Sequence, residues 1–348
     1  MGSFKPLMKL AGLPLIEHAL GAFRTVNIRE TVVVSGFCSE LLESHFKNTD
    51  IKLINNTRYA ETEMIDSIQL GLDYLQNRCD RVFIMPADMP LIQPFTIKVL
   101  SGYQTGKPLV QPVFNGRHGH PILISADCIP SILQFHGDGG LRNALRDFEK
   151  EVVEIPDPGI RMDADTPEAF SQIAACYETL HIPSRDLLLA MLEWYAGDER
   201  IVGHCLAVAS VANAIAQNAV KRGHQLNMRL VEAGALLHDI CRKKNSDHAL
   251  AAYELLNRLG YTEAGRVAGA HMDLPLDALT LLDERAVVYL ADKLVLGDKC
   301  VGLNARFARA LEKYESDSSA AAAIQRRMQD AITVMQRLGL SEEECTTF

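Results

Sequence analysis

The sequence has few of the features that mark a specialised class of protein. Its eight cysteines are scattered singly, without a Cys-x-x-Cys pair, which argues against both a disulfide framework and a thiolate zinc site. Aromatic residues make up only 6% of the chain, with a single tryptophan, so stacking platforms for nucleic-acid bases are scarce. We therefore expect a globular protein of a reducing compartment, the cytoplasm.

Charge and hydropathy exclude two further classes. The formal net charge is -9, whereas nucleic-acid binding needs clustered Lys and Arg, and the only compact basic run is Arg242-Lys243-Lys244. No apolar run approaches the roughly 18 residues of a membrane-spanning helix, and the N-terminus lacks the apolar core of a signal peptide. We expect neither a nucleic-acid partner nor a membrane.

Several common catalytic motifs are also absent. The sequence contains no Gly-x-Ser-x-Gly elbow, no complete P-loop and no dinucleotide-binding Gly-x-Gly-x-x-Gly. A serine hydrolase, a P-loop NTPase and a nicotinamide-dependent dehydrogenase are therefore not supported by the chain.

The pattern of apolar residues divides the 348 residues into two halves. A chain of this length typically forms about two domains. In the first half, short β-branched runs alternate with helix-length segments, which predicts an α/β domain with a Rossmann-like, mostly parallel sheet and helices on both faces. From Pro183 onward apolar residues recur at helical spacing almost to the end of the chain, which predicts an all-α bundle. We place the domains at residues 1–180 and 181–348, with Ser184 as a helix cap.

Acidic residues follow apolar runs in the first half. Asp88 comes directly after "RVFIMPA", and Asp163 and Asp165 precede a helix in "MDADTPEAF". Ligands of an open α/β sheet bind beyond the carboxyl ends of its strands, so these carboxylates would converge on one crevice and share a Mg²⁺ with nucleotide phosphates. The alternative is that Asp88 caps a turn and that Asp165 or Thr166 caps a helix.

Several stretches of the first half, in order, resemble the MobA-like molybdenum-cofactor nucleotidyltransferases, particularly their cytidylyltransferase-like branch. They are "MGSFKPLMKLAGLPLIEHAL", "NTRYAETEMIDSIQLGL", "MPADMPLI", "GRHGHPILIS", "GDGGLRNAL" and "MDADTPEAF". The resemblance implies transfer of a nucleotidyl group from an NTP, most simply CTP, to a molybdopterin-like acceptor with loss of pyrophosphate.

The resemblance also implies roles for individual residues. Gly2 and Lys5 would meet the triphosphate, Asp88 would bind Mg²⁺, and Asp163 would assist the metal. The acceptor would face two loops, which contain Gly119 with His120 and Asp138 with Gly139. Such a transfer needs charge neutralisation and positioning more than a reactive side chain.

The opening of the chain departs from this family. The first strand and the Gly-rich turn that hold the NTP phosphates have no counterpart before Met1, and a sheet without that strand would carry unpaired edges. We expect that the start of the natural protein lies upstream; otherwise this half would not bind NTP normally.

The second half carries a series of histidines and aspartates on apolar, helical stretches. His204, the pair His238-Asp239 and Asp292 would project into a bundle, where two imidazoles and two carboxylates suit Fe, Mn, Zn or Mg. The alternative is that the histidines are core residues bonded to the backbone. The His-Asp pair weighs against it, because burying both groups without a metal costs several kcal/mol.

These residues, in this order, resemble the HD-domain phosphohydrolases, most specifically in "LLHDICR" and "LADK". His248 and His271 match positions that bind a second metal in the dinuclear branch, although both are also compatible with a helix surface. The resemblance implies hydrolysis of a phosphate ester or anhydride, with Asp239 at the metals and Arg242 neutralising phosphate oxygens.

Together the two halves predict a bifunctional enzyme of nucleotide and pterin-like substrates, with a molybdoenzyme or its maturation factors as candidate partners. A second hypothesis makes the first half a ligand-binding regulatory module attached to an active hydrolase. The ligand set does not indicate the substrate of the hydrolase, because HD domains share a metal platform and differ in their pocket walls.

Overall fold

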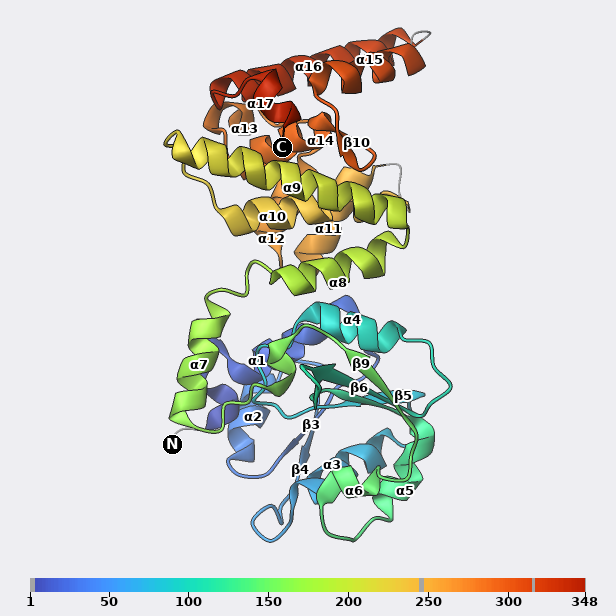
Figure 1. Cartoon of the computed structure of the whole chain (residues 1–348). Helices are drawn as coiled ribbons and strands as arrows, with labels where there is room; N and C mark the ends of the chain where they lie inside the picture. Colours follow the sequence, from blue (N-terminus) through green and yellow to red (C-terminus); the bar gives the residue numbers. More distant parts are fainter. Residues whose placement is uncertain (1–3, 244–246, 315–316, 348) are drawn as a thin grey trace. The chain divides into compact units, whose positions relative to one another are not determined.

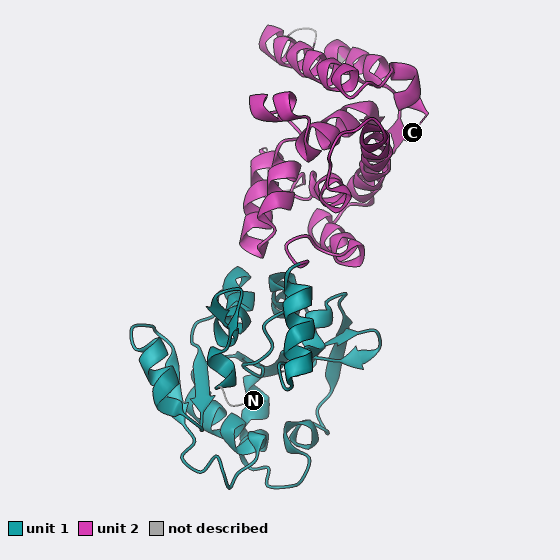
Figure 2. Ribbon diagram, turned by 90° about the vertical axis from the view of Figure 1, so that its left-hand side faces the viewer, with its two compact units in different colours: residues 1–178 teal, residues 179–348 magenta. Residues whose placement is uncertain are grey.

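The computed structural model describes residues 4–243, 247–314 and 317–347. The chain forms two compact units, residues 1–178 and 179–348, coloured separately in Figure 2. Unit 1 alternates strands and helices, and unit 2 is almost entirely helical (Figure 1). The predicted succession of an α/β domain and a helical domain is confirmed.

The strands of unit 1 lie in separate sheets. β3 and β4 form a parallel pair, whereas a larger sheet has the order β5-β8-β6-β7, with β9 parallel to β6 on its other side. Within the larger sheet β5, β6 and β9 run in one direction, and β8 and the short β7 run against them. The strands are β3 Val32–Ser35, β4 Lys52–Asn55, β5 Arg81–Ile84, β6 Leu109–Phe114, β7 Arg117–His118, β8 Ile122–Ser125 and β9 Lys150–Glu154, preceded by a hairpin of β1 Lys9–Leu10 and β2 Leu13–Pro14.

Helices cover both faces of the larger sheet. Because successive strand residues point to opposite sides, neighbouring residues of one strand contact different helices. Val82 of β5 joins a core with helices α3, α5 and α6, whereas the next residue, Phe83, packs with Ile97 of α4 on the other face. Figure 1 shows the same arrangement. The helices of unit 1 are α1 Leu15–Gly21, α2 Ser39–Phe46, α3 Met64–Leu75, α4 Pro94–Gly102, α5 Ile129–Leu133, α6 Gly140–Ala144 and α7 Pro167–Tyr177.

Local sequence explains where the helices near the predicted site begin. α3 starts with a reciprocal capping box between Glu63 and Asp66. α7 starts where the Thr166 hydroxyl accepts a hydrogen bond from Ala169 N at 3.1 Å and Pro167 occupies the first helical position. Thr166 is therefore a cap, which leaves Asp163 and Asp165 in the loop that precedes α7.

In its described residues, unit 2 is a bundle of helices with one hairpin. Ser184 caps the first helix by accepting a hydrogen bond from Leu187 N, as predicted. The hairpin of β10 Val295–Leu296 and β11 Lys299–Cys300 was not predicted, because two-residue strands give no periodic signal. The helices are α8 Arg185–Ala196, α9 Glu199–Lys221, α10 Met228–Leu237, α11 His248–Leu259, α12 Thr262–Gly269, α13 Leu276–Leu281, α14 Glu284–Leu294, α15 Leu303–Lys313, α16 Ser318–Arg337 and α17 Glu342–Thr346.

Helix α9 is the longest of the described helices and packs against α10 and α14. By length and composition alone it is apolar enough to cross a membrane, which corrects the expectation that no stretch of the chain approaches that length. Its buried side chains, including Val208, Val211 and Ile215, lie in the core of unit 2. The apolar length of α9 therefore has a structural use within the bundle.

Candidate functional site

Six histidine and aspartate side chains converge in unit 2. They are the six predicted from the sequence, namely His204, His238, Asp239, His248, His271 and Asp292. Five of them are at most 9% exposed at the side chain, and His248 is 16% exposed. A position on the helix surface, the alternative considered for the last two histidines, is wrong for His271, which is buried.

The backbone positions of these residues differ in part from the prediction that all lie on helices. His204 lies within α9 and Asp292 within α14, and His248 is the first residue of α11. The pair His238-Asp239 instead forms a turn directly after α10, and His271 follows the end of α12. The ends of α10 and α12 are thus turned toward the cluster, which brings ligands from separate helices to one point.

Backbone carbonyls fix the tautomers of three of the histidines. His204 Nδ1 lies 2.7 Å from Gly297 O in the β10–β11 turn, and His238 Nδ1 and His271 Nδ1 lie 2.7 Å from Ala235 O and Ala268 O. Because a carbonyl oxygen only accepts, each Nδ1 carries a proton and Nε2 is the ring nitrogen that faces the cluster. This is the form in which imidazole binds a metal.

Asp239 occupies the centre of the cluster, with one carboxylate oxygen toward each side. Its Oδ2 lies 3.7 Å from His204 Nε2 and 3.6 Å from His238 Nε2. Its Oδ1 lies 3.1 Å from His248 Nε2 and 3.5 Å from His271 Nε2. Two groups of ligand atoms thus share Asp239, and within each group the atoms lie within 4.8 Å of one another.

Asp292 completes the first of these groups. Its Oδ1 lies 3.2 Å from His204 Nε2 and 3.6 Å from His238 Nε2. Its Oδ2 lies 2.7 Å from the ammonium of Lys293, which is itself buried and donates a second hydrogen bond of 2.7 Å to His271 O. One oxygen of Asp292 therefore faces the cluster while Lys293 holds the other.

The donor atoms fit divalent cations. His238 Nε2 is buried and has no hydrogen-bond partner among the described residues, which a native interior rarely tolerates. Burial lowers the pKa of His238 to about 4, so its imidazole is neutral near pH 7. Burial opposes ionisation of Asp239, yet His238, His248 and His271 hold its pKa well below the usual range. A neutral His238 imidazole beside an ionised Asp239 carboxylate suits a bound metal.

Arg242 lies beside this cluster, one turn after the His-Asp pair. Its Nη1 donates to Asp239 Oδ2, and about half of its side chain is exposed. The Nε and Nη2 groups have no partner among the described residues. The guanidinium is therefore anchored at the edge of the cluster with donors available to an anion.

In unit 1, two acidic loops meet. Ala164 N donates to Asp88 O at 3.1 Å, which joins the loop after β5 to the loop before α7. Burial raises the pKa of Asp88, and the nearby carboxylates of Asp165 and Asp163 raise it further. Lys5 Nζ lies 2.9 Å from Asp165 Oδ1. The structure thus brings the three carboxylates and Lys5 into one neighbourhood, and a cation there would relieve the crowding of negative charge.

The two predicted acceptor loops border the same region only in part. Gly119, His120 and Gly139 line one cavity together with Lys5 and Asp88, whereas Asp138 is not among the lining residues. A Cβ on Gly119 would come within 2.6 Å of Ile160 O, so this position requires glycine. Gly2 lies outside the described residues.

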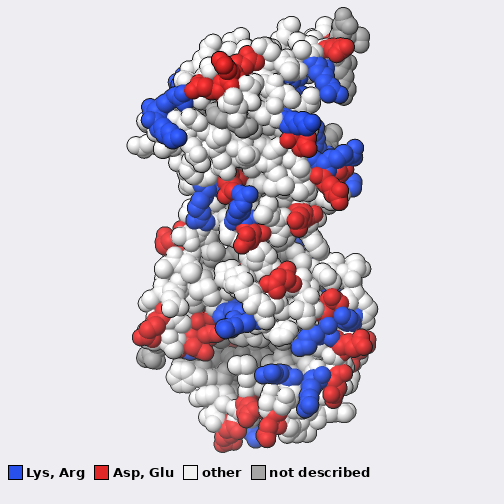
Figure 3. Space-filling model, viewed as in Figure 1, with Lys and Arg blue, Asp and Glu red and all other residues white. Residues whose placement is uncertain are grey.

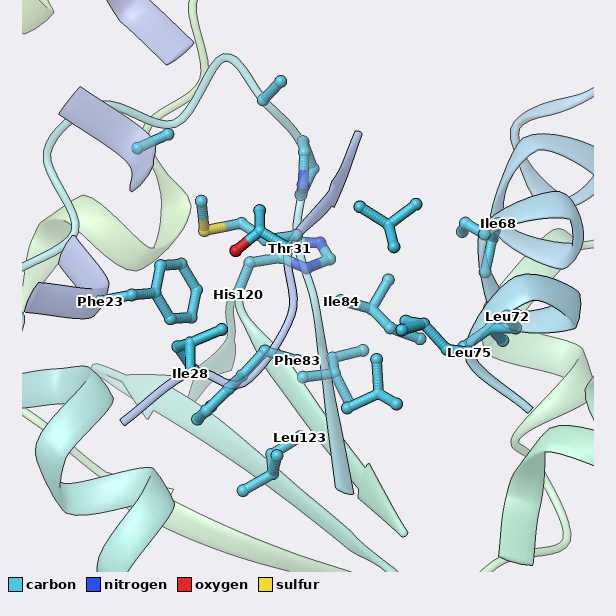
Figure 4. Close-up of a pocket in the computed structure, with 18 of the residues that line it drawn as sticks. Phe23, Ile28, Thr31, Ile68, Leu72, Leu75, Phe83, Ile84, His120 and Leu123 are labelled. Carbon is cyan, nitrogen blue, oxygen red and sulfur yellow. The ribbon is translucent and has the colours of Figure 1, made fainter. Parts of the chain in front are cut away.

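This cavity, of about 2360 Å³, lies between β3 and β5. β3 pairs only with β4 and β5 only with β8 among the described strands, so each has one edge without a partner strand. Figure 4 shows side chains such as Ile28, Phe83 and Ile84 around the cavity, with His120 among them. The lining is mostly apolar, and Lys5, Asp88 and His120 supply some of its polar groups.

Sequence reasoning missed two residues that contact the His/Asp cluster. Gly297 offers only its carbonyl, and a carbonyl has no signature in the sequence. Lys293 directly follows Asp292 in "LADK", so a charged pair within an apolar stretch was a signal that could have identified it.

Acidic and basic side chains are interspersed on the face of the molecule shown in Figure 3.

Comparison with known proteins agrees with this geometry. Residues 1–153 match the model of the MobA-like NTP transferase domain, and residues 201–296 match that of the HD domain. The molybdenum cofactor cytidylyltransferase of Escherichia coli is 28% identical over 140 residues, which cover 40% of this chain and 71% of that protein. An uncharacterized protein of Methanocaldococcus jannaschii is 33% identical over 122 residues, 30% of this chain and 72% of its own.

Among solved structures, a nucleotidyl transferase from Methanothermobacter thermautotroptrophicus aligns with a TM-score of 0.45 at 20% identity. The alignment covers 50% of this chain and 85% of that one.

Proposed function

This chain is an enzyme with a MobA-like NTP transferase domain, residues 1–153, followed by an HD domain, residues 201–296, and on this premise we propose that it catalyses two phosphorus transfers. Unit 2 would hydrolyse a phosphate ester or anhydride with two divalent cations. Unit 1 would transfer a nucleotidyl group from CTP to a molybdopterin-like acceptor. The observation that carries the first proposal is the central position of Asp239, with one oxygen toward each pair of histidines.

In the hydrolase, His204, His238, Asp239 and Asp292 would hold one cation, and Asp239, His248 and His271 the other. When bound, the cations would neutralise phosphoryl oxygens and lower the pKa of a water molecule. Hydrolysis would add the oxygen of one water molecule to phosphorus while the bond to the leaving oxygen breaks, and the two protons of that water would be divided between the products. Fe, Mn, Zn and Mg all suit this donor set.

The residues of the chain itself orient the substrate. Arg242, anchored by Asp239, presents its remaining N–H groups to a phosphoryl oxygen and offsets its charge. Lys293 keeps Asp292 fixed through its second oxygen. Because the cluster is buried except near His248 and Arg242, bulk water is largely excluded from the reacting phosphate.

In the transferase, Asp88 and Asp163 would hold Mg²⁺, and Lys5 would exchange Asp165 for the triphosphate. An acceptor phosphate oxygen would attack the α-phosphorus of CTP, and pyrophosphate would leave. The choice of CTP and of a pterin-like acceptor is supported by the named activity of the E. coli relative. A molybdoenzyme or one of its maturation factors would then receive the product, in the cytoplasm.

Two observations favour a second candidate for unit 1. Lys5 is already paired with Asp165, and β3 and β5 are separated by a large apolar cavity. Both features suit a module that binds a nucleotide or pterin without turnover and regulates the hydrolase. Binding of CTP without release of pyrophosphate would support this module and contradict the transferase.

The hydrolase is tested on the full chain by metal analysis and by phosphate release from a panel of nucleotides. We expect about two metals per chain and hydrolysis in the wild type, and the loss of both in Asp239→Ala. Glu254→Ala, which removes an exposed carboxylate of α11, is the matched control and should retain both. A wild type that binds no metal when Fe, Mn or Mg is supplied would contradict the proposal.

The transferase is tested by pyrophosphate release from CTP and GTP with a molybdopterin acceptor. We expect Asp88→Ala to abolish release and Asp73→Ala, an exposed carboxylate of α3, to leave it intact. Equal release from GTP would contradict the choice of CTP.

A further inference from the structure

A pocket of about 330 Å³ opens beside the metal cluster. It is lined by Asp247, His248, Met272, Asp273 and Arg327. His248 is the most exposed of the six ligand candidates, at 16% of its side chain against 9% or less for the others. A group attached to a phosphate at the metals would therefore leave the cluster through this pocket. The volume is at the lower end for small-molecule sites, which suits a compact, charged group.

The cationic member of this pocket, Arg327, is held in a fixed orientation. It belongs to α16, beyond the residues that match the HD domain. Its Nε donates to Asp273 Oδ1 at 3.0 Å and its Nη2 to Asp273 Oδ2 at 2.9 Å. The Tyr289 hydroxyl donates to Arg327 O at 2.9 Å and joins this turn of α16 to α14, the helix of Asp292. The guanidinium is thus preorganised, which reduces the entropic cost of binding a ligand.

The guanidinium retains donors for a ligand. Its Nη1 has no hydrogen-bond partner among the described residues, and about a quarter of the side chain is exposed. Arg326 also binds Asp273, with 3.1 Å between Nη2 and Oδ1, so two cations share one carboxylate. The other carboxylate of the pocket, Asp247, accepts a hydrogen bond from Leu250 N as the cap of α11.

We propose that Arg327 forms a second anion subsite of the hydrolase, so that its substrates carry at least two phosphates in series. One phosphate would lie at the metals beside Arg242, and the next would accept hydrogen bonds from Arg327 in the pocket. A planar guanidinium held on one edge by a carboxylate presents its other edge to phosphate. The inference rests on the proposed hydrolase and narrows its substrate class to diphosphates and longer polyphosphate compounds.

The competing explanation is that the pair of Arg327 with Asp273 only fastens α16 to the rest of unit 2. The chain provides a matched control, because Arg326 binds the same carboxylate from the same helix but does not line the pocket. A purely structural role predicts a lower melting temperature for the Arg327 variant and equal changes in the affinity for every ligand. The subsite predicts a change confined to ligands with a second phosphorus group.

The experiment measures binding of two non-hydrolysable probes to the Mn²⁺-loaded full chain by isothermal titration calorimetry. The probes are methylenediphosphonate and methylphosphonate, and Asp239→Ala supplies the baseline for binding elsewhere on the chain. Arg327→Gln should bind the diphosphonate about 10-fold more weakly than the wild type, the loss of one charge-assisted hydrogen bond, with methylphosphonate unchanged. Arg326→Gln should stay within about twofold for both probes, and Arg327→Lys should recover part of the loss.

Two results would overturn the inference alone. One is equal affinity of Arg327→Gln and wild type for the diphosphonate, and the other is an equal loss for both probes. Metal analysis before the titration separates these from failure of the proposed hydrolase: a wild type without bound Mn²⁺ overturns both proposals together.

Discussion

Lys293 and Asp292 are adjacent in sequence, and their side chains form a buried ion pair with 2.7 Å between Nζ and Oδ2. The same ammonium donates to His271 O and lies 4.7 Å from the ring centroid of Tyr289. Lys293 therefore joins a carboxylate of the first proposed metal position to the backbone of a proposed ligand of the second. We infer that it positions both.

Replacing Lys293 by methionine keeps the length of the side chain and removes its charge. Without metal, the variant leaves Asp292 short of a buried counter-ion, and we expect a loss of about 3 kcal/mol of unfolding free energy. Metal affinity should fall about 10-fold or more, as for other groups that orient ligands. Calorimetric melting with and without Mn²⁺ measures both effects. Lys299→Met, at an exposed position of β11, should change neither.

The two sides of Asp239 predict separable metal positions. His204→Ala removes a ligand of the first position only, and His271→Ala removes a ligand of the second only. We expect each variant to lose about one metal per chain and Asp239→Ala to lose both. Metal analysis after dialysis counts the bound ions. Retention of two metals by both single variants would show that the histidines do not divide between two positions.

Gly119 tests the acceptor loop of unit 1. An added Cβ would meet Ile160 Cγ1 at 2.5 Å and Ile160 O at 2.6 Å, and the adjoining His120 N donates to that carbonyl at 2.8 Å. We expect Gly119→Ala to destabilise unit 1 by about 2 kcal/mol and to reduce pyrophosphate release from CTP. Gly106→Ala is the control, because no atom lies within 4 Å of its added Cβ. Chemical denaturation compares the two variants.

The sequence was sufficient to single out His204, His238, Asp239 and Asp292, because they stand out as polar residues in apolar stretches, whereas His248 and His271 were predicted from the resemblance to the HD domain. It could not predict the contacts through which other residues orient these side chains. The contact of Lys293 with His271 O joins residues 22 positions apart, and it depends on how α14 packs against α12. The carbonyl of Gly297 is available to His204 only because a two-residue hairpin turns the chain back at that point.

In unit 1 the alternation of strands and helices identified the α/β class. The pairing of strands was not predictable to the same extent. β8 enters the sheet between β5 and β6 and runs against both, and its sequence, "ILIS", resembles that of any buried strand. Strand direction depends on the connections, and the short segment "NGRHGHP", which contains β7 and lies between β6 and β8, permits an antiparallel return.

The buried carboxyl of Asp157 should make the stability of unit 1 depend on pH. The side chain is fully buried and accepts hydrogen bonds from Thr96 Oγ1 at 2.6 Å, Gln93 N at 2.8 Å and Gly159 N at 2.9 Å. Burial raises its pKa from 3.8 to about 6 despite these donors. Between these values the folded state holds a proton that the unfolded state has released. Its contribution to stability is therefore complete below pH 3.8 and is lost as the pH rises through about 6.

The expected size of this loss is about 3 kcal/mol, from a difference of about two pKa units. Asp157→Asn has no ionisable group at this position, so its unfolding free energy lacks this part of the pH dependence. Urea denaturation of both proteins from pH 4 to pH 7 measures the difference, in which the contributions of other groups cancel. We expect wild-type stability to decline relative to that of the variant over this range. A difference that is constant with pH would mean that the three hydrogen bonds keep Asp157 ionised in the folded state.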